Sequence, residues 1–192
     1  GKEMSSQVTY ICHEESGQIT AILKGPKSVI EAPDGLYLEY DGEEDVKLDW
    51  YVSGQDVLAK PEQPSADYVF DYGAGQWSFD LALAKERKWD FIKAQRGAQE
   101  FGSFDWGGYT FQCDEVSQRR IQGAVQLAML DSGLTLDWTL ADNTVQAFTA
   151  AEFEAIGQAL AAHVGQCHER GRILRQEIDA ATSEQDLEAI SW

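Results

Sequence analysis

The chain has 192 residues, a net charge of -18 and a hydrophobic fraction of 43%. This length and apolar content predict one ordinary domain or two small ones with a packed core, rather than a disordered chain. The acidity argues against nucleic-acid binding, which needs a basic face. No apolar run reaches the roughly 18 residues of a membrane span, and no basic-then-apolar leader opens the chain, so we expect a soluble protein that is intracellular when made.

The first 60 residues predict a β-rich module, an antiparallel meander of short strands. Residues 8–24 are predicted to form a hairpin around a glycine turn. Three more short strands are predicted at 36–40, 48–52 and 56–60. Residues 61–78 begin with a proline-rich stretch that continues neither regular structure, so they are predicted to be a linker followed by one further hairpin.

Residues 79–192 predict a mainly helical domain, which makes the fold class α+β. A first helix from about residue 80 to 97 has a basic face, expected to be solvated or paired with nearby acids. Two units follow, at 104–130 and 134–181, and each has a hairpin followed by a helix. Such a unit cannot bury its apolar face alone, so we expect the two to pack on each other. A short helix is predicted to end the chain.

The two hairpin-helix units carry residues that are typical of turns and helix caps. The residues with these expected roles are Gly107, Gly108, Asp114, Asp142, Asn143, Thr149 and Glu152. Thr149 and Glu152 have the spacing of a capping box, in which each side chain accepts a hydrogen bond from the other residue's backbone N–H. The longest helix is therefore predicted to begin directly after Thr149.

That helix runs to about Ala181, and its apolar or small residues recur at steps of three and four along one stripe. The members of the stripe are Phe153, Ile156, Leu160, Val164, Cys167, Gly171, Leu174 and Ile178. The first half of the helix is expected to pack on the preceding helix. The half from Cys167 to Ile178 is expected to be free to project toward a partner, or toward a second copy of the chain in a homo-oligomer.

No sequence motif predicts catalysis, because nucleophile elbows, phosphate loops and dinucleotide fingerprints are all missing. His163 and Cys167 of the sequence His163-x-x-x-Cys167-His168 have a spacing compatible with metal ligands, but no third ligand lies nearby in sequence, and Cys12-His13 could supply one only through folding. A helix seam is the favoured interpretation. The three cysteines are predicted to be free thiols. We therefore predict a protein that is not an enzyme, with no catalytic residue, no metal and no cofactor.

Partner contacts are expected from a few apolar side chains. A chain terminus and a solvated strand are less often core, which favours Trp192 and Trp50 as interface anchors. The full set of candidate partner-binding residues is Trp50, Tyr51, Leu174, Ile178 and Trp192.

Three segments, at 114–125, 138–144 and 148–152, occur in the order seen in a known family. With them, roughly residues 79–192 resemble an uncharacterised domain at the C-terminal end of tailed-bacteriophage tail-fibre and tail-assembly proteins. Residues 34–37 and 50–62 are similar to the small β-rich start of tail-fibre assembly proteins. The resemblance implies a product of a phage, a prophage or a phage-tail-like bacteriocin, and it brings no established catalytic residue.

The resemblance implies two alternative functions. The first is a non-enzymatic assembly protein, a chaperone that binds the phage tail-fibre protein and helps it to fold or trimerise. Such a protein acts in the host bacterial cytoplasm and either leaves the fibre or stays on the virion tail. The alternative is a structural virion component of the tail tip or tail fibre, whose long helix forms a coiled coil.

Overall fold

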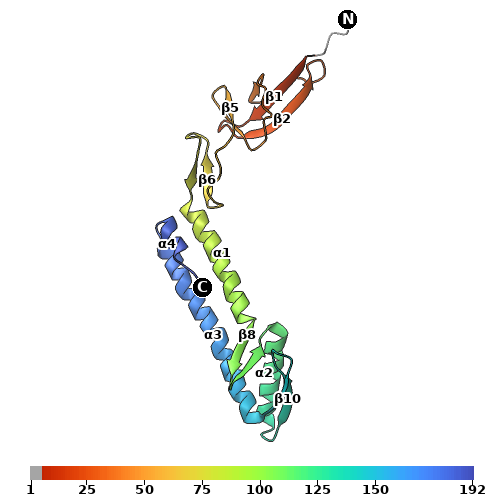
Figure 1. Ribbon diagram of the computed structural model, residues 1–192, viewed down its shortest axis with the longest axis vertical. Helices are drawn as coiled ribbons and strands as arrows, with labels where there is room; N and C mark the ends of the chain where they lie inside the picture. The colour runs from red at the N-terminus through yellow and green to blue at the C-terminus, as the bar shows by residue number, and fades with distance from the viewer. Residues whose placement is uncertain (1–5) are drawn as a thin grey trace. The chain divides into compact units, whose positions relative to one another are not determined.

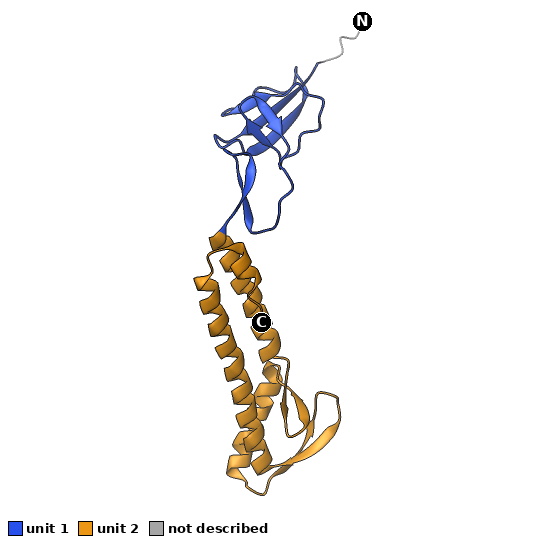
Figure 2. Cartoon of the chain, turned by 60° about the vertical axis from the view of Figure 1, so that its left-hand side comes forward, with its two compact units in different colours: residues 1–80 blue, residues 81–192 orange. Residues whose placement is uncertain are grey.

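The computed structural model describes residues 6–192 (Figure 1). The chain divides into two compact units, residues 1–80 and residues 81–192 (Figure 2). Unit 1 consists of short antiparallel strands, and unit 2 combines helices with two hairpins, so the α+β class is confirmed. The sequence placed the start of the helical part at residue 79, and the boundary between the units falls after Asp80.

The main sheet of unit 1 contains β1 (Gln7–His13), β2 (Ile19–Pro26) and β3 (Tyr37–Glu39), all antiparallel. Its strand order is β2-β1-β3, so β3 pairs with β1 and this sheet is not the meander that was predicted. A meander needs a tight turn between consecutive strands. The link from β2 to β3 spans residues 27–36, which is long enough for the chain to return to the free edge of β1.

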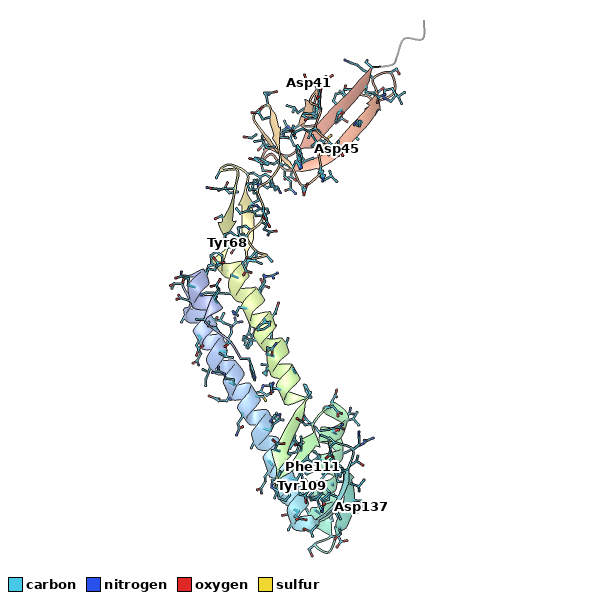
Figure 3. The ribbon with its side chains drawn as sticks, in the orientation of Figure 1. Asp41, Asp45, Tyr68, Tyr109, Phe111 and Asp137 are labelled. Atoms are coloured by element: carbon cyan, nitrogen blue, oxygen red, sulfur yellow. The ribbon has the colours of Figure 1, made fainter. Side chains whose placement is uncertain are left out.

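Two hairpins complete unit 1: β4 (Tyr51–Ser53) with β5 (Asp56–Leu58), and β6 (Tyr68–Asp71) with β7 (Gln76–Phe79). Val52 of β4 shares a hydrophobic core with Ile11 and Ile19 of the main sheet. Val46 belongs to the same core. It directly follows Asp45, so it packs the end of the acidic loop that contains Asp41 and Asp45 against the sheet (Figure 3).

Side-chain contacts fold the segment from residue 61 to 78, expected to be a linker and a hairpin, back on itself and on the preceding Lys60. The Trp77 indole Nε1 donates a hydrogen bond to the Pro61 carbonyl at 2.7 Å. The Lys60 ammonium donates to the Tyr72 hydroxyl at 2.9 Å and lies over its ring. The hairpin is therefore present as predicted, and the start of the proline-rich stretch before it is held against this hairpin.

Unit 2 contains the two predicted hairpin-helix units between a first and a last helix. Its elements are α1 (Leu81–Glu100), β8 (Ser103–Trp106), β9 (Tyr109–Gln112), α2 (Glu115–Leu130), β10 (Thr135–Thr139), β11 (Val145–Thr149), α3 (Ala150–Ala180) and α4 (Glu184–Glu188). Both hairpins turn through left-handed backbone, with φ of 59° at Gly107, 83° at Gly108 and 65° at Asn143. Glycine and asparagine tolerate that conformation best, which is why these residues occupy the turns.

The two hairpin-helix units share one hydrophobic core, as the sequence predicted. Phe111 of β9 and Phe148 of β11 meet with ring centroids 5.5 Å apart (Figure 3 labels Phe111 and its neighbour Tyr109). Ile121 of α2 and Phe153 of α3 are fully buried in the same core. The first half of α3 therefore packs on α2, in agreement with the prediction.

The second half of α3 does not project, and the expectation for Leu174 and Ile178 is wrong. Both side chains are only 1% exposed. This half of α3 lies beside α1, and the short helix α4 also contacts α1 (Figure 1). The physical reason is that α1 has an apolar face of its own, with Ala84 and Ile92 buried, and this face needs a covering helix. No helix within residues 6–192 is both long and apolar enough for a membrane crossing.

Candidate functional site

A groove of about 840 Å³ lies between α2 and α3. The α2 wall includes Gln118, Gln122, Val125, Gln126 and Met129. The α3 wall includes Glu154, Gly157, Gln158, Ala161 and Gly165. The surface is mostly aliphatic with amide groups along it, which is the composition of a site for a protein segment rather than for a highly charged ligand.

Small residues at steps of four on α3 create this groove. Gly157, Ala161 and Gly165 lie on one face of the helix because each is about one turn after the last. A Cβ atom added at Gly157 would lie 2.6 Å from Cγ2 of Val125, so α2 and α3 touch there. A Cβ added at Gly165 would meet nothing within 4 Å. The space between the helices therefore opens along α3 from Gly157 toward Gly165.

The groove is almost free of formal charge, although the whole chain has a net charge of -18. Glu154 is the one charged residue among those that line it. The amides of Gln122, Gln126 and Gln158 can each donate and accept hydrogen bonds, so they suit the backbone groups of a bound segment, whereas Gln118 already donates to the carbonyls of Cys113 and Glu100. Met129 and Leu130 at the end of α2 are 73% and 85% exposed. Large exposed apolar side chains beside a groove are typical of a protein-interaction surface.

The candidate partner-binding residues are divided between the two units. Trp50 and Tyr51 belong to unit 1, and Leu174, Ile178 and Trp192 belong to unit 2. Tyr51 is buried, with its ring centroid 4.9 Å from that of Phe70, so it is part of the fold rather than an exposed anchor. Trp50 and Trp192 are half-buried, and Trp50 packs against the core of the main sheet.

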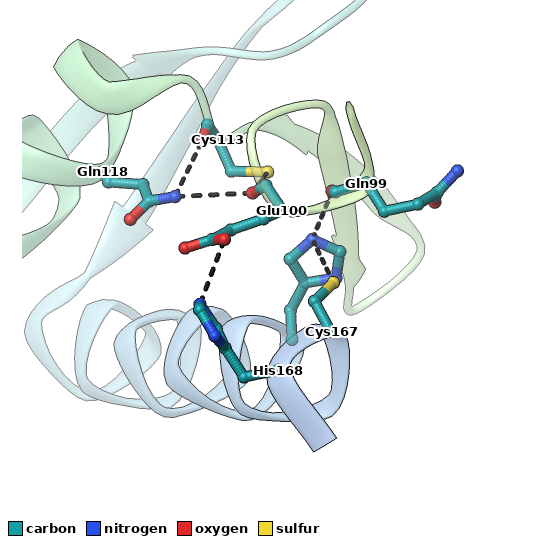
Figure 4. A network of polar contacts seen from close by, with 7 residues as sticks. Gln99, Glu100, Cys113, Gln118, Cys167 and His168 are labelled. Carbon is teal, nitrogen blue, oxygen red and sulfur yellow. Dashed lines mark hydrogen bonds and ion pairs between the residues drawn. The ribbon is translucent and has the colours of Figure 1, made fainter. Parts of the chain in front are cut away.

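Cys167 and His168 of α3 lie at the end of α1 (Figure 4), and His163 contacts the same helix end. His163 Nε2 is 2.9 Å from the carbonyl oxygen of Gln99, and His168 Nε2 is 3.1 Å from a carboxylate oxygen of Glu100. The last carbonyls of a helix have no partner within the helix, so the His163 ring satisfies one of them. Cys167 is buried beside His163. Among residues 6–192, no three His, Cys, Asp or Glu side chains are grouped so that they could hold a metal ion.

The thiols near this helix end are protonated at neutral pH. Burial, and then the nearby Cys167, Asp114 and Glu100, raise the pKa of Cys113 to about 11. Burial also raises the pKa of Cys167. The Cys113 thiol donates a hydrogen bond to the Glu100 carbonyl at 3.1 Å. Because the thiolate is the nucleophilic form, this arrangement favours a structural role for both residues.

The groove itself was missed at the sequence level, although its signal was present. The spacing of Gly157, Ala161 and Gly165 marks a helix face that is too small to fill the space beside a neighbour. Leu160 and Val164 of the apolar stripe also line the groove.

A family model described as a domain of unknown function (DUF4376) matches residues 83–191. That range covers all of unit 2 except its first two residues and its last one, so it contains the whole groove. No curated protein and no solved structure matches the chain.

Proposed function

The chain belongs to the DUF4376 family, whose description assigns no activity, and we propose that it is a non-enzymatic tail-fibre assembly protein. In this proposal it comes from a phage, a prophage or a phage-tail-like bacteriocin. It binds the tail-fibre protein in the host bacterial cytoplasm and helps that protein to fold or trimerise. The family context of the proposal rests on the sequence resemblance of residues 79–192 to phage tail proteins.

The α2–α3 groove is the observation that carries the proposal. Its α2 wall runs from Gln118 to Met129, which corresponds to about 16 Å at 1.5 Å per residue. This length matches about three turns of an amphipathic helix, and laying an apolar helix face into a groove is a recurrent mode of peptide recognition. We assign the groove to such a helical segment of the fibre. With Glu154 as its one charged lining residue, the groove adds little local repulsion toward an acidic segment of the fibre.

The alternative, a structural fibre subunit with a coiled coil, depended on the apolar stripe of α3. In unit 2 that stripe is buried from Phe153 at its start to Ile178 at its end, except for Val164, which is half-buried. A partner helix would have to displace contacts within the chain in order to use it. The burial of the stripe therefore disfavours the coiled coil and leaves the assembly role as the better proposal. A homo-oligomer would need other residues of α3.

Co-expression with a tail-fibre protein tests the proposal. Gly165→Leu places a side chain in the open part of the groove without a clash, because no atom lies within 4 Å of the added Cβ. Gly123→Leu is the matched control, since Gly123 is exposed on α2, also has open space, and does not line the groove. We expect soluble trimeric fibre with the unchanged protein and with Gly123→Leu, and aggregated fibre with Gly165→Leu.

Two results would contradict the proposal. One is a fibre that is soluble and trimeric without this protein. The other is a Gly165→Leu protein that supports assembly as well as the control does. Sedimentation of the fibre and its migration as a trimer on a native gel distinguish these outcomes.

A further inference from the structure

We propose that a second site, between α1 and the second half of α3, binds a small oxyanion, either a phosphate or a carboxylate group. The site is a pocket of about 320 Å³ lined by Trp89, Arg96, His168, Arg172, Arg175 and Gln176. It shares no lining residue with the α2–α3 groove, and it goes beyond the proposed function. Three guanidinium groups and no carboxylate line it, in a chain whose net charge is -18.

The indole of Trp89 brings two of the guanidinium groups together. The Cζ atom of Arg175 lies 5.0 Å from the ring centroid, and that of Arg96 lies 5.9 Å from it. Cation–π attraction explains why each guanidinium stays on the ring. The two positively charged guanidinium groups still repel each other across the Trp89 ring. An anion bound between them would offset this repulsion.

Arg96 is the strongest single indication of a ligand. Its Nε atom is buried and has no hydrogen-bond partner, and no ion pair joins Arg96 to a carboxylate in the described chain. Its side chain is fixed against α3, since a Cβ added at Gly171 would lie 3.2 Å from Arg96 Cδ. A buried donor without an acceptor is costly in free energy, and a bound ion can supply the missing acceptor. An oxyanion would satisfy the guanidinium and neutralise its charge.

The other two arginines keep donors available for the same ligand. Arg175 pairs with Asp179 at 3.2 Å, and Arg172 pairs with Glu169, both as neighbours on the surface of α3. Such exposed pairs contribute little free energy, and a guanidinium has five N–H groups. His168 already pairs with Glu100, so it lines the pocket without donating a hydrogen bond to the ligand. A planar guanidinium fork matches both carboxylate and phosphate oxygens.

The test is a titration of the full-length ¹⁵N-labelled protein, followed by NMR. Sodium phosphate and sodium acetate are added in separate experiments, with sodium chloride keeping the ionic strength constant. We expect saturable shifts of the Trp89 indole N–H and the Arg96 Nε–H signals, and the stronger of the two titrations identifies the preferred oxyanion. Arg96→Met should weaken binding at least about tenfold, because it removes a charged hydrogen-bond donor.

Arg120→Met is the matched control, since Arg120 is exposed on α2 and lines neither site. If Arg96→Met loosens the contact of α1 with α3, as thermal unfolding will show, Arg175→Gln decides, because Arg175 is half-exposed and its loss removes only its cation–π contact with Trp89 from that contact. Weaker binding by either folded variant, with binding by the control unchanged, supports the site. Shifts that do not saturate with phosphate or acetate overturn it. Binding by both folded variants as tight as that of the control overturns it as well.

Discussion

At the scale of single residues, Leu174 shows how burial separates a core position from a partner surface. Its side chain is 1% exposed, whereas that of the adjacent Ile173 is 40% exposed. Leu174→Ala should lower the free energy of unfolding by about 2–5 kcal/mol, the usual cost of a cavity in a packed core. Ile173→Ala should change it by less than about 0.5 kcal/mol. Urea denaturation measures both, and equal stability of the two variants would mean that this half of α3 is not core.

Asp114 gives the start of α2 a dependence on pH. Its carboxylate accepts hydrogen bonds from the Ser117 hydroxyl at 2.7 Å and the Ser117 backbone N–H at 3.0 Å, and these lower the pKa of Asp114 below its ordinary value of 3.8. The stabilisation is fully present above that ordinary value and is lost as the pH falls through the lowered one.

As the pH falls from about 5 to about 2, the Asp114→Asn variant should therefore lose less stability than the unchanged protein. Asparagine also caps a helix, but it does not titrate. Thermal unfolding at a series of pH values provides the comparison. Parallel pH profiles for the two proteins would show that the Asp114 carboxylate does not contribute.

Local residue roles could be predicted from the sequence, and long-range ones could not. Thr149 and Glu152 form their capping box because both partners lie within one turn. Lys85 instead donates to the carbonyl of Asp179 at 2.8 Å, and Lys88 donates to that of Ile190 at 2.9 Å. The predicted solvated face of α1 thus satisfies carbonyls near the ends of α3 and α4. Nothing in the helical periodicity of α1 identifies acceptors that far along the chain.

At the scale of elements, α3 depends on its first turn. Glu152 N–H donates to the Thr149 hydroxyl at 3.3 Å, and Thr149 N–H donates to the Glu152 carboxylate at 2.8 Å. Thr149→Ala should cost about 1 kcal/mol of stability, the typical value for a lost N-cap. Hydrogen exchange at residues 150–153 should accelerate, while exchange near Leu174 should follow only the change in global stability. Unchanged exchange at the first turn would count against the cap.

The contact of α2 with α3 predicts opposite effects for two glycines. Gly157→Ala should destabilise by about 1–3 kcal/mol, because the added methyl overpacks against Val125. Gly165→Ala should stabilise by about 0.5–1 kcal/mol, because open space receives the methyl and alanine favours the helix. Chemical denaturation of both variants gives the two signs. A shared sign would show that the helices do not diverge between these positions.

Element types and hairpin partners were predictable, whereas the pairing of distant elements was not. The turn residues at Gly107 and Asn143 join strands that are adjacent in sequence, so local chemistry determines their pairing. The choice of β1 as the partner of β3 depends on a link of ten residues, 27–36, that has no such signal. The small residues that border the groove were visible in the sequence, but the groove itself was not, because it depends on the distance between two helices.

At the scale of the whole molecule, each unit has a core of its own. The core around Ile11 and Val52 lies within residues 1–80, and the core around Phe111 and Phe148 lies within residues 81–192. We therefore expect the fragment 81–192 to fold cooperatively by itself, with the same circular dichroism per helical residue as in the full chain. Calorimetry should assign one transition of the full chain to this fragment. A fragment without a cooperative transition would show that unit 2 depends on unit 1.

The single helix α3 serves two different neighbours, α2 with its first half and α1 with its second. Each residue inserted between the halves would rotate one contact face by about 100° relative to the other. A single insertion near Gly165 would turn Leu174 away from α1 while Phe153 stayed on α2. Seven inserted residues would restore the angle to within about 20°, but they would shift the second half by about 10 Å. The length of α3 therefore sets both the angle between its two contact faces and the distance between its two neighbours. We expect insertions in this family to occur in the hairpin turns instead.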